Sequence, residues 1–472
     1  MTRADHYLRE RYLDNGGRSR LLSLYYAIKP ALPRRVQLGL RRAYARRQAK
    51  RQFPSWPVEP ILVDLRDAEL RTAIARAPSG RVPIVNYWPE GKRFAVILTH
   101  DVEGEAGVRN IRRVMEIERR HGFVSSWNFV AEWYPIEPGL FDHIRSLGGE
   151  IGLHAIKHDG KLFESRASFE AELPKIHRYL RDWQAVGFRS PATHRNAEWM
   201  PELGCLYDSS FPDTDPFEPQ PGGCCSIFPF FLGEIVELPI TLVQDHTLFE
   251  ILRSRSIDRW TEKSDWIIRN HGLINLNTHP DYLDTPERLG LYEEFLAYLS
   301  SQRDGWHALP RDVALWWRTR AALDCEQRDG TVLLAGPGAE RASVAWARDT
   351  GDAIVFEPEP SEVASAPARE TRLLAVGANL SLLNSDALQA PLSEATGTGL
   401  LASLVLLAIF LLTPRVSGTA AAAWQAAMSA ITVLSASRKF KGANEKSLRG
   451  GGDRPTVTRT GGSGLTMPPA HA

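Results

Sequence analysis

Two acidic residues lie where an apolar run ends, at a spacing that suits metal-assisted hydrolysis. Asp101 and Glu103 belong to THDVE, which completes the nearly continuous apolar run 94–99. Two carboxylates spaced i, i+2 at a strand end can take different roles, one as a metal ligand and the other as a base. Acidic residues are common after strands, so this pattern needs support from other positions.

Two histidines follow a second apolar run and complete a set of metal ligands. His154 and His158 lie in GLHAIKHDG, directly after the run 150–153. Histidines at i, i+4 can converge on one cation, although this spacing alone also fits two unrelated histidines. Two histidines and one carboxylate leave coordination positions open for water and a substrate carbonyl, as in catalytic sites. The combination favours a hydrolase in which a Lewis acid polarises an amide or ester carbonyl.

The elements that must position these residues alternate between strand and helix over residues 92–320. Strands buried on both faces appear as short apolar runs, whereas the helices show a longer amphipathic period. Expected strands are 94–99, 124–130, 150–153 and 273–277, a strand end is expected at 187–189, and expected helices are 108–120, 139–147, 168–183 and 287–301. Polar chemistry at strand C-termini favours an α/β fold of the (β/α) barrel type.

The polar motifs, taken together, resemble those of a known family. In order, THDVE, HAIKH, FRSP, LYDSS and THP are similar to the five motifs of the polysaccharide deacetylase family, also called carbohydrate esterase family four or the NodB-homology domain. The resemblance covers roughly half of the chain, and the joint order is more specific than any single motif. It implies an irregular (β/α) barrel that removes N- or O-acetyl groups from sugars.

The resemblance also implies roles for the residues of the first two motifs. Asp101 matches the general base, which deprotonates a metal-bound water that attacks the amide or ester carbonyl. Glu103 falls at the position of the metal-binding acid, and His154 and His158 match the two metal-binding histidines. The implied cofactor is a divalent metal, with zinc as the usual ion of the family.

Three further catalytic residues follow from the later motifs. Arg189 matches the arginine that orients the base, Asp208 matches the acid that tunes the catalytic histidine, and His279 matches the general acid. An arginine beside the base would keep it ionised, and a carboxylate beside His279 would favour the imidazolium form. One group could then accept a proton while the other donates one.

Other polar and aromatic residues are candidates for substrate binding. His194 either contacts substrate or belongs to a surface loop, and Asp245 and His246 either line the pocket or serve as satisfied loop groups. Trp127 and Trp133 lie in and just after the second expected strand. Aromatic faces bind sugars, but core packing is the alternative for both tryptophans.

The regions on either side of the barrel differ in composition. Residues 1–91 form a helical N-terminal extension whose stretch 34–51 carries eight basic residues and no acidic one. This stretch could lie on an anionic membrane surface or dock on the next domain. Residues 325–360 contain three β-like runs, which predict a small β appendage.

The C-terminal part changes character beyond about residue 360. Residues 361–437 are expected to be a linker with apolar segments, and 438–472 a disordered tail. The uncharged segment 399–413 could be a transmembrane helix, a buried helix, or a tail outside the ancestral fold.

Composition excludes some partners and suggests a compartment. The chain has 472 residues and a net charge of +1, which offers no general attraction to nucleic acid. Its four cysteines lack zinc-site spacing and suggest free thiols in a reducing compartment. The N-terminus lacks an apolar secretion signal. We therefore expect a cytoplasmic protein, which the basic helix or the segment 399–413 could associate with the inner face of the membrane.

The sequence leaves three functions open. The first is a metal-dependent hydrolase that deacetylates an acetylated sugar or glycan precursor. The second is a small-molecule amidase of the same superfamily that acts on a nitrogen heterocycle. The third is an inactive barrel that serves as a glycan-binding or assembly module, which the complete set of ligand-type residues disfavours.

Overall fold

The structure, a computed structural model, describes residues 2–13, 39, 42–45, 47–48, 53–328 and 331–358. The chain divides into two units after residue 386, and all described residues lie in the first unit. Much of the basic stretch 34–51, the apolar segment 399–413 and the expected tail 438–472 lie outside the described residues. Among the helices that the structure describes, none combines the length and the apolar character that a membrane span requires.

Strand β2 (Phe94–Val102) forms the centre of the main sheet. All nine of its residues are buried, as the apolar run at its start predicts. One edge of β2 pairs in parallel with β3 (Ser126–Phe129), and the other pairs in parallel with β9 (Leu273–Thr278). Both strands therefore end beside Asp101, at the carboxyl edge of the sheet.

The remaining strands continue the sheet on both sides of β2. The strand order is β10-β2-β3-β4-β5-β6-β8-β7, and β9 pairs with β2 outside this series. Strand β7 is antiparallel to its neighbour β8. The bounds of the remaining strands are β4 Glu150–Leu153, β5 Gly187–Phe188, β6 Tyr207–Asp208, β7 Phe230–Leu232, β8 Ile235–Glu237 and β10 Gly305–His307. The N–H groups of Thr241 and Leu242 donate to the carbonyl of Asn275 on β9. These bonds join the β8 end of the sheet to β9, and the fold is an irregular (β/α) barrel.

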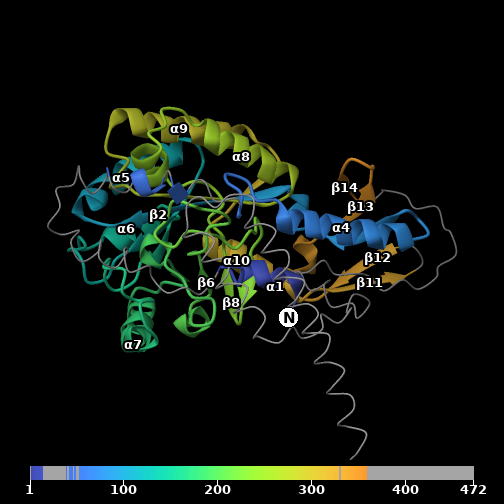
Figure 1. Ribbon diagram of the computed structural model, residues 1–472, viewed down its shortest axis with the longest axis horizontal. Coiled ribbons are helices and arrows are strands. Elements are labelled where there is room, and N and C mark those ends of the chain that lie inside the picture. Colours follow the sequence, from blue (N-terminus) through green and yellow to red (C-terminus); the bar gives the residue numbers. More distant parts are fainter. Residues whose placement is uncertain are drawn as a thin grey trace, which may run out of the picture. The chain divides into compact units, whose positions relative to one another are not determined.

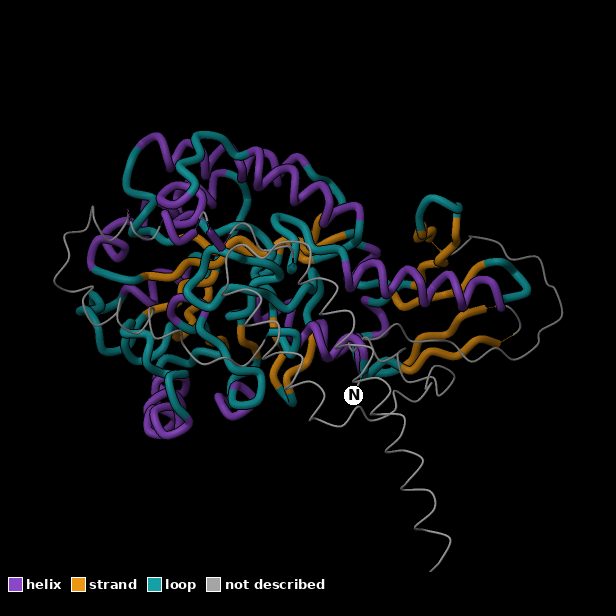
Figure 2. Tube along the Cα trace, in the orientation of Figure 1, coloured by secondary structure: helices purple, strands orange, loops and turns teal. Residues whose placement is uncertain are grey.

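Helices cover the outer side of this barrel (Figure 2). They are α5 Glu105–Arg120, α6 Leu140–Ser146, α7 Arg166–Asp182, α8 Asp258–Arg269, α9 Pro286–Ser301 and α10 Pro310–Ala321. Helices α8 and α9 lie side by side, and α5 lies next to α9 (Figure 1). Ile274 and Leu276 of β9 join the apolar core beneath these helices, whereas Asn275 and Asn277 alternate with them and bond to groups inside the barrel.

Segments before and after the barrel form a second, smaller sheet. Strand β1 (Arg81–Val85) pairs antiparallel with β13 (Val344–Asp349), which also pairs with β14 (Ile354–Pro358). Helix α4 (Ile61–Arg76) lies against this sheet (Figure 1). The three predicted β-like runs are strands β12, β13 and β14, and β12 (Thr331–Ala335) pairs with β11 (Asp324–Arg328). The predicted N-terminal extension and β appendage therefore share one sheet.

Short helices and turns complete the described elements. They are helix α1 Arg3–Leu8, the 3₁₀ turns η2 Pro89–Gly91, η3 Pro191–Thr193, η4 Met200–Leu203 and η6 Ala339–Arg341, and the π-helical turn η5 His246–Ile251.

Two ion pairs fasten the described parts of the N-terminal region to barrel loops. The buried guanidinium of Arg195 donates from Nε to the Glu10 carboxylate at 2.7 Å. Arg42 donates to the carbonyl of Glu250 at 2.8 Å and lies 3.5 Å from its carboxylate. These contacts join the extension to the loops that follow β5 and β8.

Candidate active site

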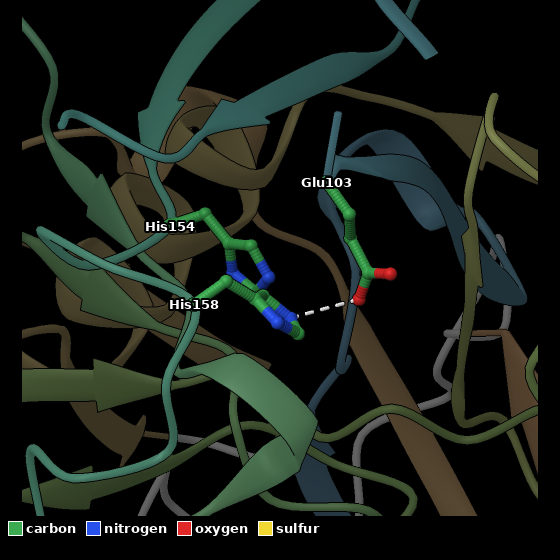
Figure 3. A group of neighbouring side chains, drawn as sticks. All are labelled: Glu103, His154 and His158. Atoms are coloured by element: carbon green, nitrogen blue, oxygen red, sulfur yellow. Dashed lines mark ion pairs between the residues drawn. The ribbon is translucent and has the colours of Figure 1, made fainter. Parts of the chain in front are cut away.

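Three side chains from two barrel loops converge into one cluster of metal-ligand type (Figure 3). Glu103 follows β2, whereas His154 and His158 follow β4, and one ligand atom from each lies within 4.8 Å of the others. His158 Nε2 lies 2.9 Å from Glu103 Oε1. His154 is buried, while Glu103 and His158 remain partly exposed, so the cluster can be reached from outside.

Backbone hydrogen bonds explain why these residues meet. The N–H of His154 donates to the carbonyl of Phe129, which continues the β3–β4 ladder by one residue. The N–H of Glu103 donates to the carboxylate of Asp281 at 3.0 Å, and the N–H of Gly107 donates to its other oxygen. Asp281 thus fixes the loop that carries Glu103 and accepts from the first turn of α5.

The chemistry of His154 fits a metal ligand. Its Nδ1 bonds to the carbonyl of Arg189 at 3.0 Å, so Nδ1 carries the proton and Nε2 keeps its lone pair. Among the described residues this buried Nε2 has no hydrogen-bond partner. Burial lowers the pKa of His154 to about 4, which keeps the ring neutral. A neutral imidazole with a free lone pair is the form that binds metal.

Glu103 and His158, the other two residues of the cluster, shift each other's pKa towards opposite charges. Burial would raise the pKa of Glu103, but the His158 and His279 rings hold it well below its usual range. Burial would lower the pKa of His158, but the Glu103 carboxylate outweighs this and raises it. Glu103 is therefore an anionic oxygen donor, as the hard or borderline cations used in hydrolases require.

Asp101 lies next to this cluster as a buried, fully oriented carboxylate. Its Oδ1 accepts from Asn128 Nδ2 at 2.9 Å, and its Oδ2 accepts from Asn277 Nδ2 at 2.8 Å. Arg189 lies 3.4 Å from the same Oδ2. Burial would raise the pKa of Asp101, but the charge of the Arg189 guanidinium outweighs burial and helps to hold this pKa at about 2. The carboxylate is ionised, which is the state that a base requires.

Strand register places the amide of Asn128 against Asp101. Asp101 on β2 is the direct partner of Asn128 on β3, and Asn128 is in turn the partner of Gly152 on β4. A Cβ at position 152 would lie 2.0 Å from the Asn128 side-chain oxygen. Glycine at this position therefore leaves the room that the Asn128 side chain occupies.

Arg189 has the position predicted for it. Its guanidinium is buried and donates to Thr99 Oγ1 at 3.1 Å and to Ser209 Oγ at 2.9 Å, besides the contact with Asp101. Because Arg189 also supplies the carbonyl that fixes the His154 ring, one residue orients both the base and a metal-ligand histidine.

His279 faces both acidic residues from the opposite loop. Its Nε2 lies 4.0 Å from Asp101 Oδ2 and 3.7 Å from Glu103 Oε1. Its Nδ1 lies 2.6 Å from Asp245 Oδ1, and its backbone N–H donates to Asp245 Oδ2 at 2.8 Å. Burial would lower the pKa of His279, but the carboxylates of Asp245 and Glu103 outweigh burial and raise it to about 10. The ring is a protonated group that can act as an acid.

The predicted partner of His279 needs correction. Asp208 was expected to tune this histidine, but its carboxylate accepts from the N–H and O–H of Ser210, both at 2.9 Å, and lies beside Glu237. Burial raises the pKa of both Asp208 and Glu237. Asp245, predicted as a pocket residue, makes the contact instead.

The structure rules out one of the predicted substrate-binding residues and leaves others as predictions. Trp127 is fully buried and stacks on His100 with ring centroids 4.1 Å apart, so its core-packing alternative holds and it cannot present a face to substrate. The ring of His246 is tilted against that of Tyr282 with centroids 5.0 Å apart, and the Tyr282 centroid lies 5.4 Å from that of His279. His194 is half-buried at the end of η3, five residues after Arg189. Substrate contacts of His194 and His246 stay predictions.

Sequence reasoning missed three residues that orient the site. Asn128 and Asn277 donate to Asp101, and Asp281 accepts from the backbone of Glu103. A signal existed for the first two, because each is a polar residue within an apolar strand, VSSWNFV or LINLN. Buried polar groups require partners. Asp281 directly follows the THP motif, and no local pattern marks it as the acceptor for the backbone of Glu103.

Comparison with known proteins gives similarity at the level of solved structures. No family model matches the chain, and no curated protein matches it. A crystal structure described as a polysaccharide deacetylase from Mycobacterium smegmatis is 20% identical, with a TM-score of 0.40, and the match covers 50% of this chain and 93% of that one. The Puue allantoinase is 15% identical, with a TM-score of 0.41 and coverages of 51% and 95%.

A third similar structure is a family 4 carbohydrate esterase from Streptomyces lividans in complex with acetate. It is 13% identical, with a TM-score of 0.30, and the match covers 46% of this chain and 93% of that one.

Proposed function

We propose that this chain is a metal-dependent hydrolase that removes acetyl groups from an acetylated sugar or glycan precursor. The observation that carries the proposal is the convergence of Glu103, His154 and His158 beside the Asp101–His279 pair. Ligand-type donors, an ionised carboxylate and a protonated imidazole thus meet at the carboxyl edge of one barrel, which suits acyl hydrolysis.

Glu103, His154 and His158 would hold a divalent ion, for which zinc is the first candidate. Two histidine nitrogens and one carboxylate oxygen form a ligand set of catalytic zinc sites. When bound, such an ion supplies a Lewis acid that polarises the acetyl carbonyl and makes attack by water easier at neutral pH. The neutral state of His154 and the anionic state of Glu103 are the protonation states that this role needs.

Asp101 and His279 divide the proton transfers between them. Asp101, held by Asn128 and Asn277, takes a proton from the attacking water. His279, held by Asp245, gives a proton to the leaving nitrogen or oxygen of the sugar. Because His279 Nε2 lies 4.0 Å from Asp101, both groups can serve one scissile bond.

Hydrolysis and metal content together test the proposal. Purified protein is assayed on a chromogenic acetyl ester and on acetylated chito-oligosaccharides, with a chelator, with added zinc, and without either. Wild type should hold about one metal ion per chain and lose activity with the chelator, and zinc should restore it. A double variant, His154→Ala with His158→Ala, should lose both metal and activity, whereas His143→Ala on α6 should keep both.

The outcomes distinguish the alternatives. Metal binding with no turnover of either acetylated substrate, but with hydrolysis of a heterocyclic amide, would replace the deacetylase with the amidase. Oligosaccharide binding without metal and without hydrolysis would favour the inactive module. Full activity in the double variant would refute a catalytic role for the cluster.

A cytoplasmic location stays a prediction of the sequence. An alkaline phosphatase fusion placed after Leu412 should be inactive if this part of the chain stays inside the cell. An active fusion would contradict the cytoplasmic prediction.

A further inference from the structure

Trp133 combines a large apolar side chain with an exposed position. Half of its side-chain surface is exposed, at 50%, in contrast to Trp127 six residues earlier, which is fully buried. Single exposed apolar side chains are common on protein surfaces, so the surroundings of Trp133 decide what its ring can do.

The turn that carries Trp133 lies between the two segments that carry the metal-ligand residues. On its N-terminal side, the N–H of Ala131 donates to the carbonyl of Ala155, and the N–H of Glu132 donates to the carbonyl of Ile156 at 2.8 Å. Ile156 is midway between His154 and His158 in the sequence. Trp133 is therefore one residue away from a direct bond to the histidine loop.

On the other side of Trp133, the turn is bonded to the Glu103 loop. The hydroxyl of Tyr134 donates to the carbonyl of Val102, the residue before Glu103, and accepts from the N–H of Val130. Both neighbours of Trp133 thus make hydrogen bonds to residues within two positions of a metal-ligand side chain. The backbone that carries the exposed ring therefore borders the candidate active site.

Contacts with α7 hold this turn in place. The Glu132 carboxylate accepts from Lys175 Nζ at 2.9 Å and from the Tyr179 hydroxyl at 3.4 Å, and Arg178 lies 3.6 Å away. Since the backbone on both sides is bonded and Glu132 is engaged by α7, a ligand on Trp133 would meet a preformed surface and lose little loop entropy.

We propose that Trp133 is a platform for a pyranose ring of the substrate, next to the acetyl group that is removed. One face of a pyranose presents C–H groups, and its hydroxyls project at the rim, so an indole can cover the apolar face while the hydroxyls stay hydrated. This inference rests on the proposed function and narrows its substrate to a saccharide with a ring beside the cleaved group.

A comparison of two substrates tests the platform. Trp133→Ala should lower kcat/KM for an acetylated chito-oligosaccharide about 10-fold more than kcat/KM for 4-nitrophenyl acetate, mainly through KM; this factor corresponds to about 1.4 kcal/mol. Trp133→Phe, which keeps an aromatic face, should recover most of the loss. Leu315→Ala removes an equally exposed apolar side chain on α10 and should leave both substrates at wild-type values. Equal losses on both substrates, or none, would overturn the platform.

A binding measurement separates this inference from the proposed function. If wild type hydrolyses neither substrate, the hydrolase proposal fails and the platform is judged by calorimetric titration with the same oligosaccharide. An affinity about 10-fold weaker in Trp133→Ala than in wild type supports the platform. Equal affinities, or no binding to wild type, would refute it.

Discussion

Asp245 holds His279 at two points, through the ring Nδ1 at 2.6 Å and through the backbone N–H at 2.8 Å. The two bonds fix both the position of the residue and the tautomer of the ring, so that Nε2 faces Asp101 and Glu103. Asp245 itself is fully buried. Enzymes direct a histidine proton towards substrate in this way: a buried carboxylate holds Nδ1 of the imidazole, and Nε2 faces the substrate.

Replacement of Asp245 by asparagine should therefore damage proton donation. Asp245→Asn keeps the size of the side chain but removes the negative charge that keeps His279 protonated, and we expect kcat/KM on the chromogenic ester to fall about 100-fold or more. The paired control is Asp208→Asn, which changes a carboxyl bonded to Ser210 instead of His279 and should cost less than about 10-fold. A larger loss in Asp208→Asn than in Asp245→Asn would restore the role first predicted for Asp208.

Asp281 should control metal affinity without being a ligand. Asp281→Ala frees the backbone of Glu103, and we expect the affinity for zinc to fall about 10-fold to 100-fold, as for other residues that orient ligands. Gly107→Ala should have the same effect, because a Cβ there would lie 2.1 Å from the Asp281 carboxylate and displace it.

Gly290→Ala is the matched control for this pair of variants. Position 290 on α9 has open space around it, so alanine should leave metal affinity unchanged and slightly stabilise the helix. Zinc titration against a competing chelator measures all three variants. Wild-type affinity in Gly107→Ala would show that Asp281 does not position Glu103.

Substitutions of two asparagines on β9, Asn275 and Asn277, should have different effects, one on stability and the other on the catalytic rate. Asn277→Leu removes a donor from Asp101 and should lower kcat on the ester about 10-fold, with metal content unchanged. Asn275→Leu, two residues earlier, removes bonds to Ser209 and to two carbonyls and should lower the free energy of unfolding by about 1–3 kcal/mol. Steady-state kinetics, metal analysis and urea unfolding of both variants test the separation; equal kinetic losses would refute it.

Glu150 should make the fold less stable at higher pH. Its buried carboxyl accepts from the Tyr207 hydroxyl at 2.8 Å, and burial raises its pKa from 4.5 to about 7. Below pH 4.5 the folded and unfolded states both hold the proton. As pH rises towards 7 the unfolded state loses it first, so stability falls across this window by up to about 3 kcal/mol.

Glu150→Gln should abolish this loss. The variant should gain stability relative to wild type between pH 4.5 and pH 8, as measured by urea unfolding at both values. Glu340→Gln, at an exposed position, should follow wild type. The same pH dependence in Glu150→Gln as in wild type would contradict the assignment.

The strands near the site were predictable because their apolar runs are buried on both faces. The run 150–153 became β4 with the same limits, and 273–277 became β9 with one more residue. Strands β5 and β6 have two residues each, which is too short for any periodicity to show. Helix α8, between the last two motifs, was missed altogether.

The site residues that belong to a sequence motif could be predicted. The roles that depend on contacts between distant residues could not. Arg189 lies against Asp101 as expected. Which carboxylate contacts His279 depends on how the loop after β8 reaches β9, and a long-range backbone contact of this kind leaves no local pattern in the sequence. Hydrogen bonds from Asn128 likewise depend on strand register, which the sequence alone does not specify.

The pairing of β1 with β13 means that a fragment limited to the barrel, residues 92–320, would lack strands that pair across its two flanks. A fragment that begins at residue 92 would remove one of the two neighbours of β13, and one that stops at residue 320 would leave β1 without its partner. Either cut exposes unpaired strand edges, which favour aggregation. Expression trials should therefore keep both flanks together, and poor yield from the bare barrel would say nothing about its chemistry.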